Sequence, residues 1–271
     1  MRSTPFVLSI PVALLTAGAV AQSTSATYQL TFNGAWSGQS HPAAYPFAAH
    51  FSPLIGATHN ADVSFWSPGG LASPGIESMA ETGSTTGLRA EINAFAAEGY
   101  ASTPIGGRGF NSPGSTTLTF QVSSTRPTLT MVSMVAPSPD WFVGVHGLEL
   151  MTPMGWADEL VIPLFAYDAG TDSGTNFNSI DANTVPQEPI ASFLSTAPFS
   201  GLPQLGTFTL RLLSVEVCFA DANSDGALTT ADFNTWIAAF NAQSPACDQN
   251  GDNACTPADF SAWIANFNAG C

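Results

Sequence analysis

The chain has 271 residues, of which five are Lys or Arg and twenty are Asp or Glu, giving a formal net charge of −15. So acidic a chain cannot neutralise many phosphates, which excludes nucleic acid as a partner. A hydrophobic content of 45% with nineteen phenylalanines indicates a packed core rather than disorder, and the length suffices for one large and one small domain.

The first 21 residues have the pattern of a secretory signal peptide. Arg2 precedes an apolar run over residues 6–15, and Ala19-Val20-Ala21 forms a small-residue cleavage site before Gln22. The run is too short for a membrane span, and no later apolar run of about 18 residues follows. We expect a secreted or cell-surface protein without a transmembrane anchor.

Residues 22–215 are expected to form an antiparallel β-sandwich, because short alternating segments follow one another between turn signals. In the clearest segment, Leu118, Phe120 and Val122 alternate with polar residues. Helices are expected at residues 75–81 and 88–97. Strands are expected at residues 28–32, 63–66, 117–122, 128–135, 141–145, 160–167 and 207–217.

Residues 34–60 show little periodicity but contain three histidines, His41, His50 and His59. Their spacing matches no compact zinc motif, so histidines of the core or of turns are the preferred interpretation, and a zinc site is the alternative.

Two loops carry candidate metal ligands. Pro137 and Pro139 stiffen the first, which presents Asp140, and the second holds Asp168 and Asp172 among glycines. Acids on stiff turns at one end of a sheet suit calcium, but Asp and Gly are also ordinary turn residues. The spacing alone leaves both interpretations open.

Several ordered motifs between residues 25 and 213 resemble the spondin domain, the N-terminal module of the spondins and mindin. The resemblance is carried by residues 28–42, 49–60, 66–75, 137–145 and 168–174. It implies an antiparallel β-sandwich with one calcium, held by Asp140, Asp168 and Asp172. Cysteines that brace the animal modules are missing between Gln22 and Val217, so the sandwich must be stabilised by its core alone.

The C-terminal part, residues 216–271, contains a repeat with a period of 27 residues. Each copy is a twelve-residue loop with oxygen side chains at positions 1, 3, 5, 9 and 12, the spacing that binds one calcium. Position 6 requires a positive φ, which Gly226 and Asn253 would adopt. The predicted ligands of the two calcium ions are Asp221, Asn223, Asp225, Ala227, Thr229 and Asp232, and then Asp248, Asn250, Asp252, Ala254, Thr256 and Asp259.

Position 12 is Asp rather than Glu and no helix enters either loop, so the repeat resembles a type I dockerin. This resemblance implies a small α-helical calcium-loop domain with pseudo-twofold symmetry that binds a cohesin-like partner or a cell surface. Similar tails occur on exported bacterial proteins, sometimes without a known cohesin. A stability module that binds only calcium is the alternative.

All four cysteines lie at or beyond Cys218, which in an exported protein indicates two disulfides. Of three possible pairings we prefer Cys218–Cys271 with Cys247–Cys255.

The sequence lacks the usual catalytic motifs, including G-x-S-x-G, H-E-x-x-H and a phosphate-binding glycine loop. The favoured function is therefore non-catalytic: calcium-dependent adhesion, with an unknown protein or glycan ligand. One alternative is a secreted enzyme, acting for example on polysaccharide and delivered by its tail; another is a structural module of a cell surface. A pair of carboxylates in a cleft away from every metal site would favour the enzyme.

Overall fold

The computed structural model describes residues 25–152, 155–216, 218–225 and 228–269. The signal peptide predicted at residues 1–21 lies outside them. The described chain is mostly β, with antiparallel sheets and few helices, as the sequence predicts.

The first sheet has four antiparallel strands in the order β11-β14-β1-β6. They are β1 (Ser25–Gly34), β6 (Gly114–Ser123), β11 (Glu159–Leu164) and β14 (Gly206–Glu216).

The second sheet is built around β7 (Thr128–Ala136) and β8 (Trp141–Glu149). Its main path is β13-β12-β8-β7-β2-β5, while β3 pairs with β7 and with β4. The shorter strands are β2 (His50–Phe51), β3 (Ile55–His59), β4 (Ile105–Gly106), β5 (Phe110–Asn111), β12 (Tyr167–Asp168) and β13 (Ala191–Ser192), and a separate hairpin joins β9 (Met151–Thr152) to β10 (Gly155–Trp156).

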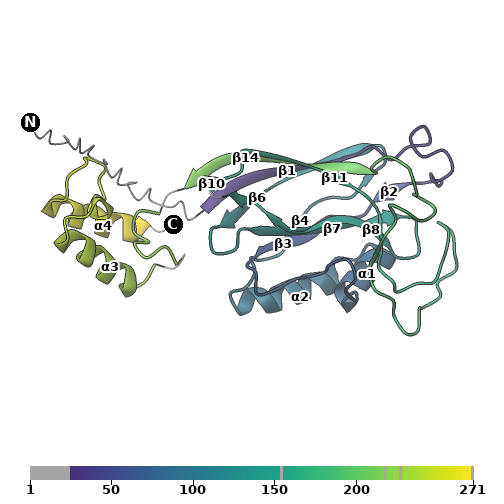
Figure 1. Ribbon diagram of the computed structural model, residues 1–271, viewed down its shortest axis with the longest axis horizontal. Coiled ribbons are helices and arrows are strands. Elements are labelled where there is room, and N and C mark those ends of the chain that lie inside the picture. Colours follow the sequence, from purple (N-terminus) through teal and green to yellow (C-terminus); the bar gives the residue numbers. More distant parts are fainter. Residues whose placement is uncertain (1–24, 153–154, 217, 226–227, 270–271) are drawn as a thin grey trace, which may run out of the picture.

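The two sheets pack face to face over the main hydrophobic core (Figure 1). Alternate residues of β1, Tyr28, Leu30 and Phe32, are fully buried there, because successive side chains of a strand point to opposite faces. They meet Trp141 and Val143 of β8 in the same cluster.

Two helices, α1 (Pro74–Thr82) and α2 (Thr86–Ala97), cover the other face of the second sheet (Figure 1). Ile76 and Met79 of α1 pack there with Val132 of β7 in a second core. Since β7 lies between the two cores, all nine of its residues are buried.

Both predicted helices are present, and most predicted strands are too. The prediction for residues 160–167 merges two strands: β11 belongs to the first sheet, whereas β12 pairs with β8 in the second. The prediction of a strand at residues 63–66 is wrong; these residues form an irregular segment that places Phe65 and Trp66 in the second core. Neither β2 nor β3 was predicted.

The C-terminal part contains α3 (Thr230–Asn241), a 3₁₀ turn η1 (Pro245–Cys247) and α4 (Pro257–Ala269). It lies at the end of the sheets where β1 begins and β14 ends (Figure 1).

Candidate metal centres

Asp140 belongs to the turn between β7 and β8. Figure 1 shows this turn at the end of the sheets opposite the tail. Its side chain is fully buried. One oxygen, Oδ2, accepts hydrogen bonds from the backbone N–H of Thr171 at 2.8 Å and of Asp172 at 3.1 Å. The other, Oδ1, is buried without a hydrogen-bond partner among the described residues. A buried carboxylate oxygen without a partner is costly unless a cation or a water meets it.

Asp168 is brought beside Asp140 by strand pairing, because it lies opposite Trp141 in the β12–β8 register. Burial, and next the charge of Asp140, raise the pKa of Asp168 from 3.8 to about 6, although the N–H of Gly170 opposes this shift. Burial also raises the pKa of Asp140, against hydrogen bonds from Asp172 and Thr171. Both carboxyls are thus raised in pKa mainly by burial, and a bound cation would offset the cost of ionising them there.

Gly170 makes the loop between these acids possible. Its φ is +74°, and a Cβ there would lie only 2.1 Å from the carbonyl oxygen of Glu188. Only glycine satisfies both conditions, so the loop brings the backbone N–H groups of Thr171 and Asp172 onto Asp140.

Asp172 is buried next to this pair, but its carboxylate also organises the loop. Its oxygens accept hydrogen bonds from the N–H of Gly174 at 2.6 Å and of Ala182 at 3.0 Å. Its charge acts on Asp140 and raises the pKa of that carboxyl. The three aspartates are thus neighbours, but their ligand atoms do not form one group within 4.8 Å, as those of another cluster do.

Glu81, in the last turn of α1, is a member of this region that sequence reasoning missed. Its Oε1 is buried without a hydrogen-bond partner in the described part of the chain. Burial raises the pKa of Glu81; a hydrogen bond with Thr171 opposes the shift, while the charges of Glu77, Asp181 and Asp140 add to it. No local spacing could reveal Glu81, because its position depends on the packing of α1 against the second sheet.

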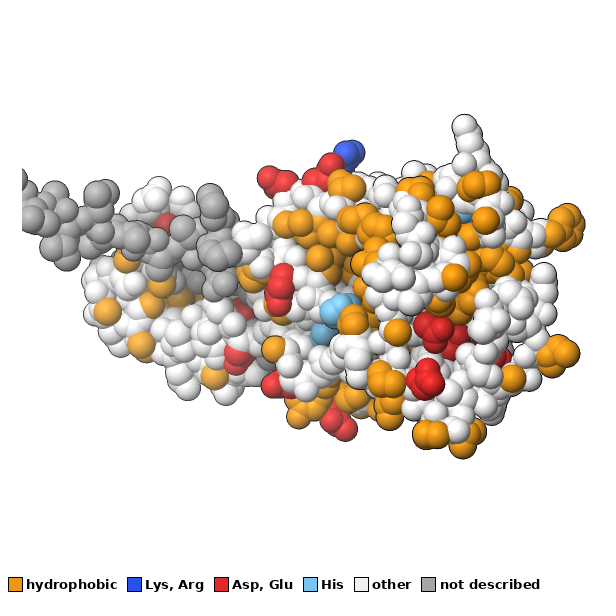
Figure 2. Space-filling model, turned by 45° about the vertical axis from the view of Figure 1, so that its right-hand side comes forward, with side chains coloured by type: hydrophobic (Ala, Val, Ile, Leu, Met, Phe, Trp, Pro, Cys, Tyr) orange, Lys and Arg blue, Asp and Glu red, His pale blue; other side chains and the backbone are white. Residues whose placement is uncertain are grey.

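The region has the donors that a hard cation such as calcium prefers, carboxylate oxygens with room for backbone carbonyls. The ion pair found in the described chain joins Arg211 to Glu159, on β14 and β11, so no arginine is paired with these acids. Among the charged side chains on the face shown in Figure 2, most are acidic.

The first loop of the tail gathers its acids closely. Ligand atoms of Asp221, Asp225 and Asp232 lie within 4.8 Å of one another. Asp232 accepts hydrogen bonds from the N–H of Thr229 at 2.8 Å and of Asn223 at 3.3 Å, so it closes the loop onto α3. The predicted carbonyl ligand Ala227 and the predicted turn residue Gly226 lie outside the described residues.

The second loop repeats this arrangement. Asp259 is fully buried and accepts from the N–H of Thr256 at 2.8 Å and of Asn250 at 3.3 Å. Burial alone would raise the pKa of Asp259, but the hydrogen bonds from Thr256, Gln249 and Asn250 lower it. Asn253 adopts a φ of +64°, as predicted for position 6. The predicted carbonyl ligand Ala254 donates its N–H to Asp252 at 2.8 Å.

The exiting helices of the two loops pair reciprocally. Phe233 of α3 lies 5.0 Å from Trp263 of α4, and Trp236 of α3 lies 5.7 Å from Phe260 of α4, measured between ring centroids. Since Phe233 corresponds to Phe260 and Trp236 to Trp263 in the repeat, each contact maps onto the other, which is the signature of a twofold axis.

Cys247 and Cys255 form a disulfide, as preferred from the sequence. Cys271 lies outside the described residues, so its pairing with Cys218 stays a prediction. No cysteine in the described part is free.

The three histidines do not converge. His41 bonds Ser40 and the carbonyl of Pro203, His59 bonds Thr130 and the carbonyl of Asn60, and His50 bonds the carbonyl of Ala48. Burial lowers the pKa of both His41 and His59. The preferred interpretation, histidines of the core and of turns, fits these contacts, whereas the zinc alternative does not.

In the part of the chain that the structure describes, no helix is long and apolar enough to cross a membrane.

Comparison with known proteins identifies the β domain. A family model described as Spondin_N matches residues 26–201. Spondin-2 of Homo sapiens is 36% identical over 182 residues, which are 64% of this chain and 54% of Spondin-2. Spondin-1 of Bos taurus is 37% identical over 179 residues, which are 63% of this chain and 22% of Spondin-1.

The chain therefore spans about half, or less, of the length of these curated relatives. The C-terminal repeat lies beyond the residues that the family model matches. The relatives are secreted proteins of the extracellular matrix, which confirms the predicted extracellular localisation. The chain belongs to the Spondin_N family.

Proposed function

We propose that this protein is a non-catalytic, calcium-binding adhesion protein of the extracellular space, attached through its C-terminal repeat. Its Spondin_N domain binds one calcium through Asp140, Asp168 and Asp172, and binds a protein or glycan ligand. The tail is a dockerin-like module with two further calcium ions. The observation that carries the proposal is the buried, unpartnered Oδ1 of Asp140 among carboxyls of raised pKa.

Calcium supplies the positive charge that these acids lack and accepts irregular sets of oxygen ligands. Asp140 would be the central ligand, because its Oδ2 is already held by two N–H groups and its Oδ1 remains available. Asp168 would bind the ion as a carboxylate. Asp172 would contribute one oxygen while continuing to hold its loop.

In the tail, the support comes from the matching loops. Equivalent aspartates, Asp232 and Asp259, are both fully buried and both bond the backbone of their own loop. Burial of a carboxylate in so small a module is explained by an ion bound in each loop.

The attachment role is supported by an exposed apolar residue at the same place in each repeat. Ile237 of α3 and Ile264 of α4 are 38% and 41% exposed. An apolar residue displayed by both repeats suits a partner module such as a cohesin.

The alternative of a secreted enzyme gains no support from two prominent pockets in the described structure. The larger, of about 640 Å³, contains one carboxylate, Asp221, which belongs to a predicted metal loop, and the smaller, of about 270 Å³, contains none. A glycosidase would need a pair of carboxyl groups facing one cleft.

Calorimetric titration of the chelator-treated full chain tests the calcium sites. We expect three sites, reduced to two by Asp140→Asn, Asp232→Asn or Asp259→Asn singly, and unchanged by Asp62→Asn, an exposed control. If Asp140→Asn binds as many calcium ions as the wild type, the proposed calcium site of the Spondin_N domain is contradicted.

Attachment is tested by binding the calcium-loaded chain to a panel of cohesin modules. The variant with both Ile237→Asp and Ile264→Asp should lose binding at least tenfold, while Leu71→Asp, at a 62% exposed position of the β domain, should not. If no cohesin binds but all calcium sites are present, the tail is a stability module.

A further inference from the structure

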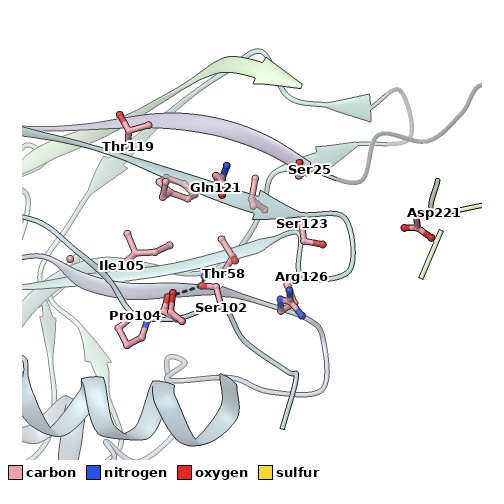
Figure 3. Close-up of a pocket in the computed structure, with 14 residues that line it drawn as sticks. Ser25, Thr58, Ser102, Pro104, Ile105, Thr119, Gln121, Ser123, Arg126 and Asp221 are labelled. Carbon is pink, nitrogen blue, oxygen red and sulfur yellow. Dashed lines mark hydrogen bonds between the residues drawn. The ribbon is translucent and has the colours of Figure 1, made fainter. Parts of the chain in front are cut away.

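A second candidate site lies at the opposite end of the β domain from Asp140. It is a pocket of about 640 Å³ between the edge strand β6 and the segment of residues 102–106 (Figure 3). This volume falls within the range of small-molecule sites. The pocket is formed at the open side of the domain, because β6 pairs with β1 only and ends its sheet.

The wall of the pocket is rich in hydroxyl and amide groups. Thr119, Gln121 and Ser123 come from β6, and Thr58 and Ser102 from the opposite side (Figure 3). The side chain of Gln121 is exposed and forms no hydrogen bond with another described residue, whereas the hydroxyl of Ser102 accepts from the N–H of Thr58 at 3.1 Å. A wall of this composition suits a ligand with many hydroxyl groups and disfavours an apolar one.

Arg126 supplies a positive charge to this wall. It is held on the turn after β6 by the hydrogen bond from its N–H to the carbonyl of Ser123 at 2.9 Å, and its guanidinium donates to the carbonyl of Gly99 at 3.3 Å. Its Nε is buried without a partner in the described structure. The buried Nε is closed to a ligand, but the guanidinium N–H groups that Gly99 does not use can donate to a carboxylate or a sulfate in this polar pocket.

We propose that this pocket binds an anionic saccharide unit, with its carboxylate or sulfate on Arg126 and its hydroxyl groups on Gln121 and Ser102. Asp221 lies at the same end of the pocket as Ser123 and Arg126 (Figure 3), and its carboxylate would oppose an anion there unless the calcium proposed for the first loop of the tail neutralises it. The side chains that would contact the sugar are not proposed calcium ligands, but the inference rests on the proposed calcium site in one respect, the neutralisation of Asp221.

The test is saturation-transfer NMR with calorimetry on the full chain in calcium. The probes are glucuronate, glucose 6-sulfate and glucose at millimolar concentration. We expect the anionic sugars to bind and glucose to bind at least tenfold more weakly. The stronger of the two anionic probes identifies the charged group as carboxylate or sulfate.

Variants locate the binding. Arg126→Gln should weaken the anionic probe at least tenfold, and Gln121→Ala, which removes an exposed side chain and leaves the fold intact, should weaken it several-fold. Arg211→Gln is the matched control, since it removes an exposed arginine on β14 whose ion pair is with Glu159. Raising NaCl to 1 M should weaken the anionic probes and leave glucose unchanged.

The proposal is overturned if neither anionic sugar binds, if glucose binds as well as they do, or if Arg211→Gln weakens binding as much as Arg126→Gln. Equal binding of N-acetyl-aspartate amide would also overturn it, because the pocket would then recognise acidic peptides.

Discussion

At the residue scale, the acids around Asp140 show what a sequence can and cannot predict. Asp140, Asp168 and Asp172 were identified from turn chemistry and from the resemblance to the spondin domain, and they are neighbours in the structure. Glu81 was not, because no pattern in the sequence brings a helix terminus to a loop 59 residues later. Electrostatic neighbours from distant elements depend on packing, which local spacing does not encode.

Substituting Asp140 should have opposite effects with and without calcium. In chelator, Asp140→Asn removes a buried charge but keeps an oxygen for the N–H groups of Thr171 and Asp172, so the melting temperature should equal or exceed that of the wild type. In calcium it should fall below the wild type, because the ion loses a ligand. Scanning calorimetry in both conditions measures this.

Asp62→Asn is the control for these opposite effects on the melting temperature, since Asp62 is exposed. A parallel loss of stability in both conditions would make Asp140 a simple structural residue.

In the calcium-free protein, the contribution of Asp168 to stability should fall as the pH rises. The pKa of Asp168 is about 6 when folded and 3.8 in its ordinary state, so between these values the folded protein binds more protons than the unfolded one. The contribution is complete below about pH 4 and is lost as the pH rises through about 6. Allowing for the partial exposure of Asp168, we expect a loss on the order of 1 kcal/mol.

Urea unfolding in chelator at several pH values from 4 to 7 measures this loss, with Asp168→Asn as the variant in which it should shrink. The readout is the difference between the wild type and Asp168→Asn, because the lowered pKa values of His41 and His59 act in the opposite direction over this interval. A difference that stays constant from pH 4 to 7 would contradict a raised pKa of Asp168 in the fold.

At the element scale, strands with one buried face were predictable from their alternation, and of two strands buried on both faces the long β7 was predicted whereas the short β3 was not. In β1 and β6, buried and more exposed residues alternate, which the sequence displays directly. All five residues of β3 are buried, so Ile55–His59 shows no alternation. The expected strand at residues 160–167 failed for another reason: the chain passes from one sheet to the other between Leu164 and Tyr167, and hydrophobicity does not record which sheet a strand joins.

The start of α1 depends on one serine. The Oγ of Ser73 accepts a hydrogen bond from the N–H of Ile76 at 3.2 Å and donates to Glu91 of α2 at 2.7 Å. Ser73→Ala removes both contacts and should lower the free energy of unfolding by about 1–2 kcal/mol. Urea denaturation measures this change.

Ser78→Ala, within the same helix, is the comparison for Ser73→Ala and should change stability by less than about 0.5 kcal/mol, because Ala is the better helix former. Equal effects of the two substitutions would contradict the capping role of Ser73.

At the scale of the whole molecule, acidic side chains gather in separate regions. Acids gather around Asp140 at one end of the β domain and in the two loops of the tail beyond the other end. The anion-binding pocket proposed above lies between these regions, beside one of the few arginines. The composition alone indicated that the net charge is negative. Only the fold shows that the acidic clusters and the proposed anion-binding pocket occupy different parts of the molecule.

The strand β7 has a further consequence, because it contributes to both hydrophobic cores and is buried along its whole length. Neither the first sheet nor the helical layer can separate without exposing one face of β7, so both layers should open in a single event. In native-state hydrogen exchange, the amides of β7 should be the slowest of the protein and should exchange only through global unfolding. If amides of α1 and α2 exchange with the same free energy, helices and sheets form one cooperative unit despite having separate cores.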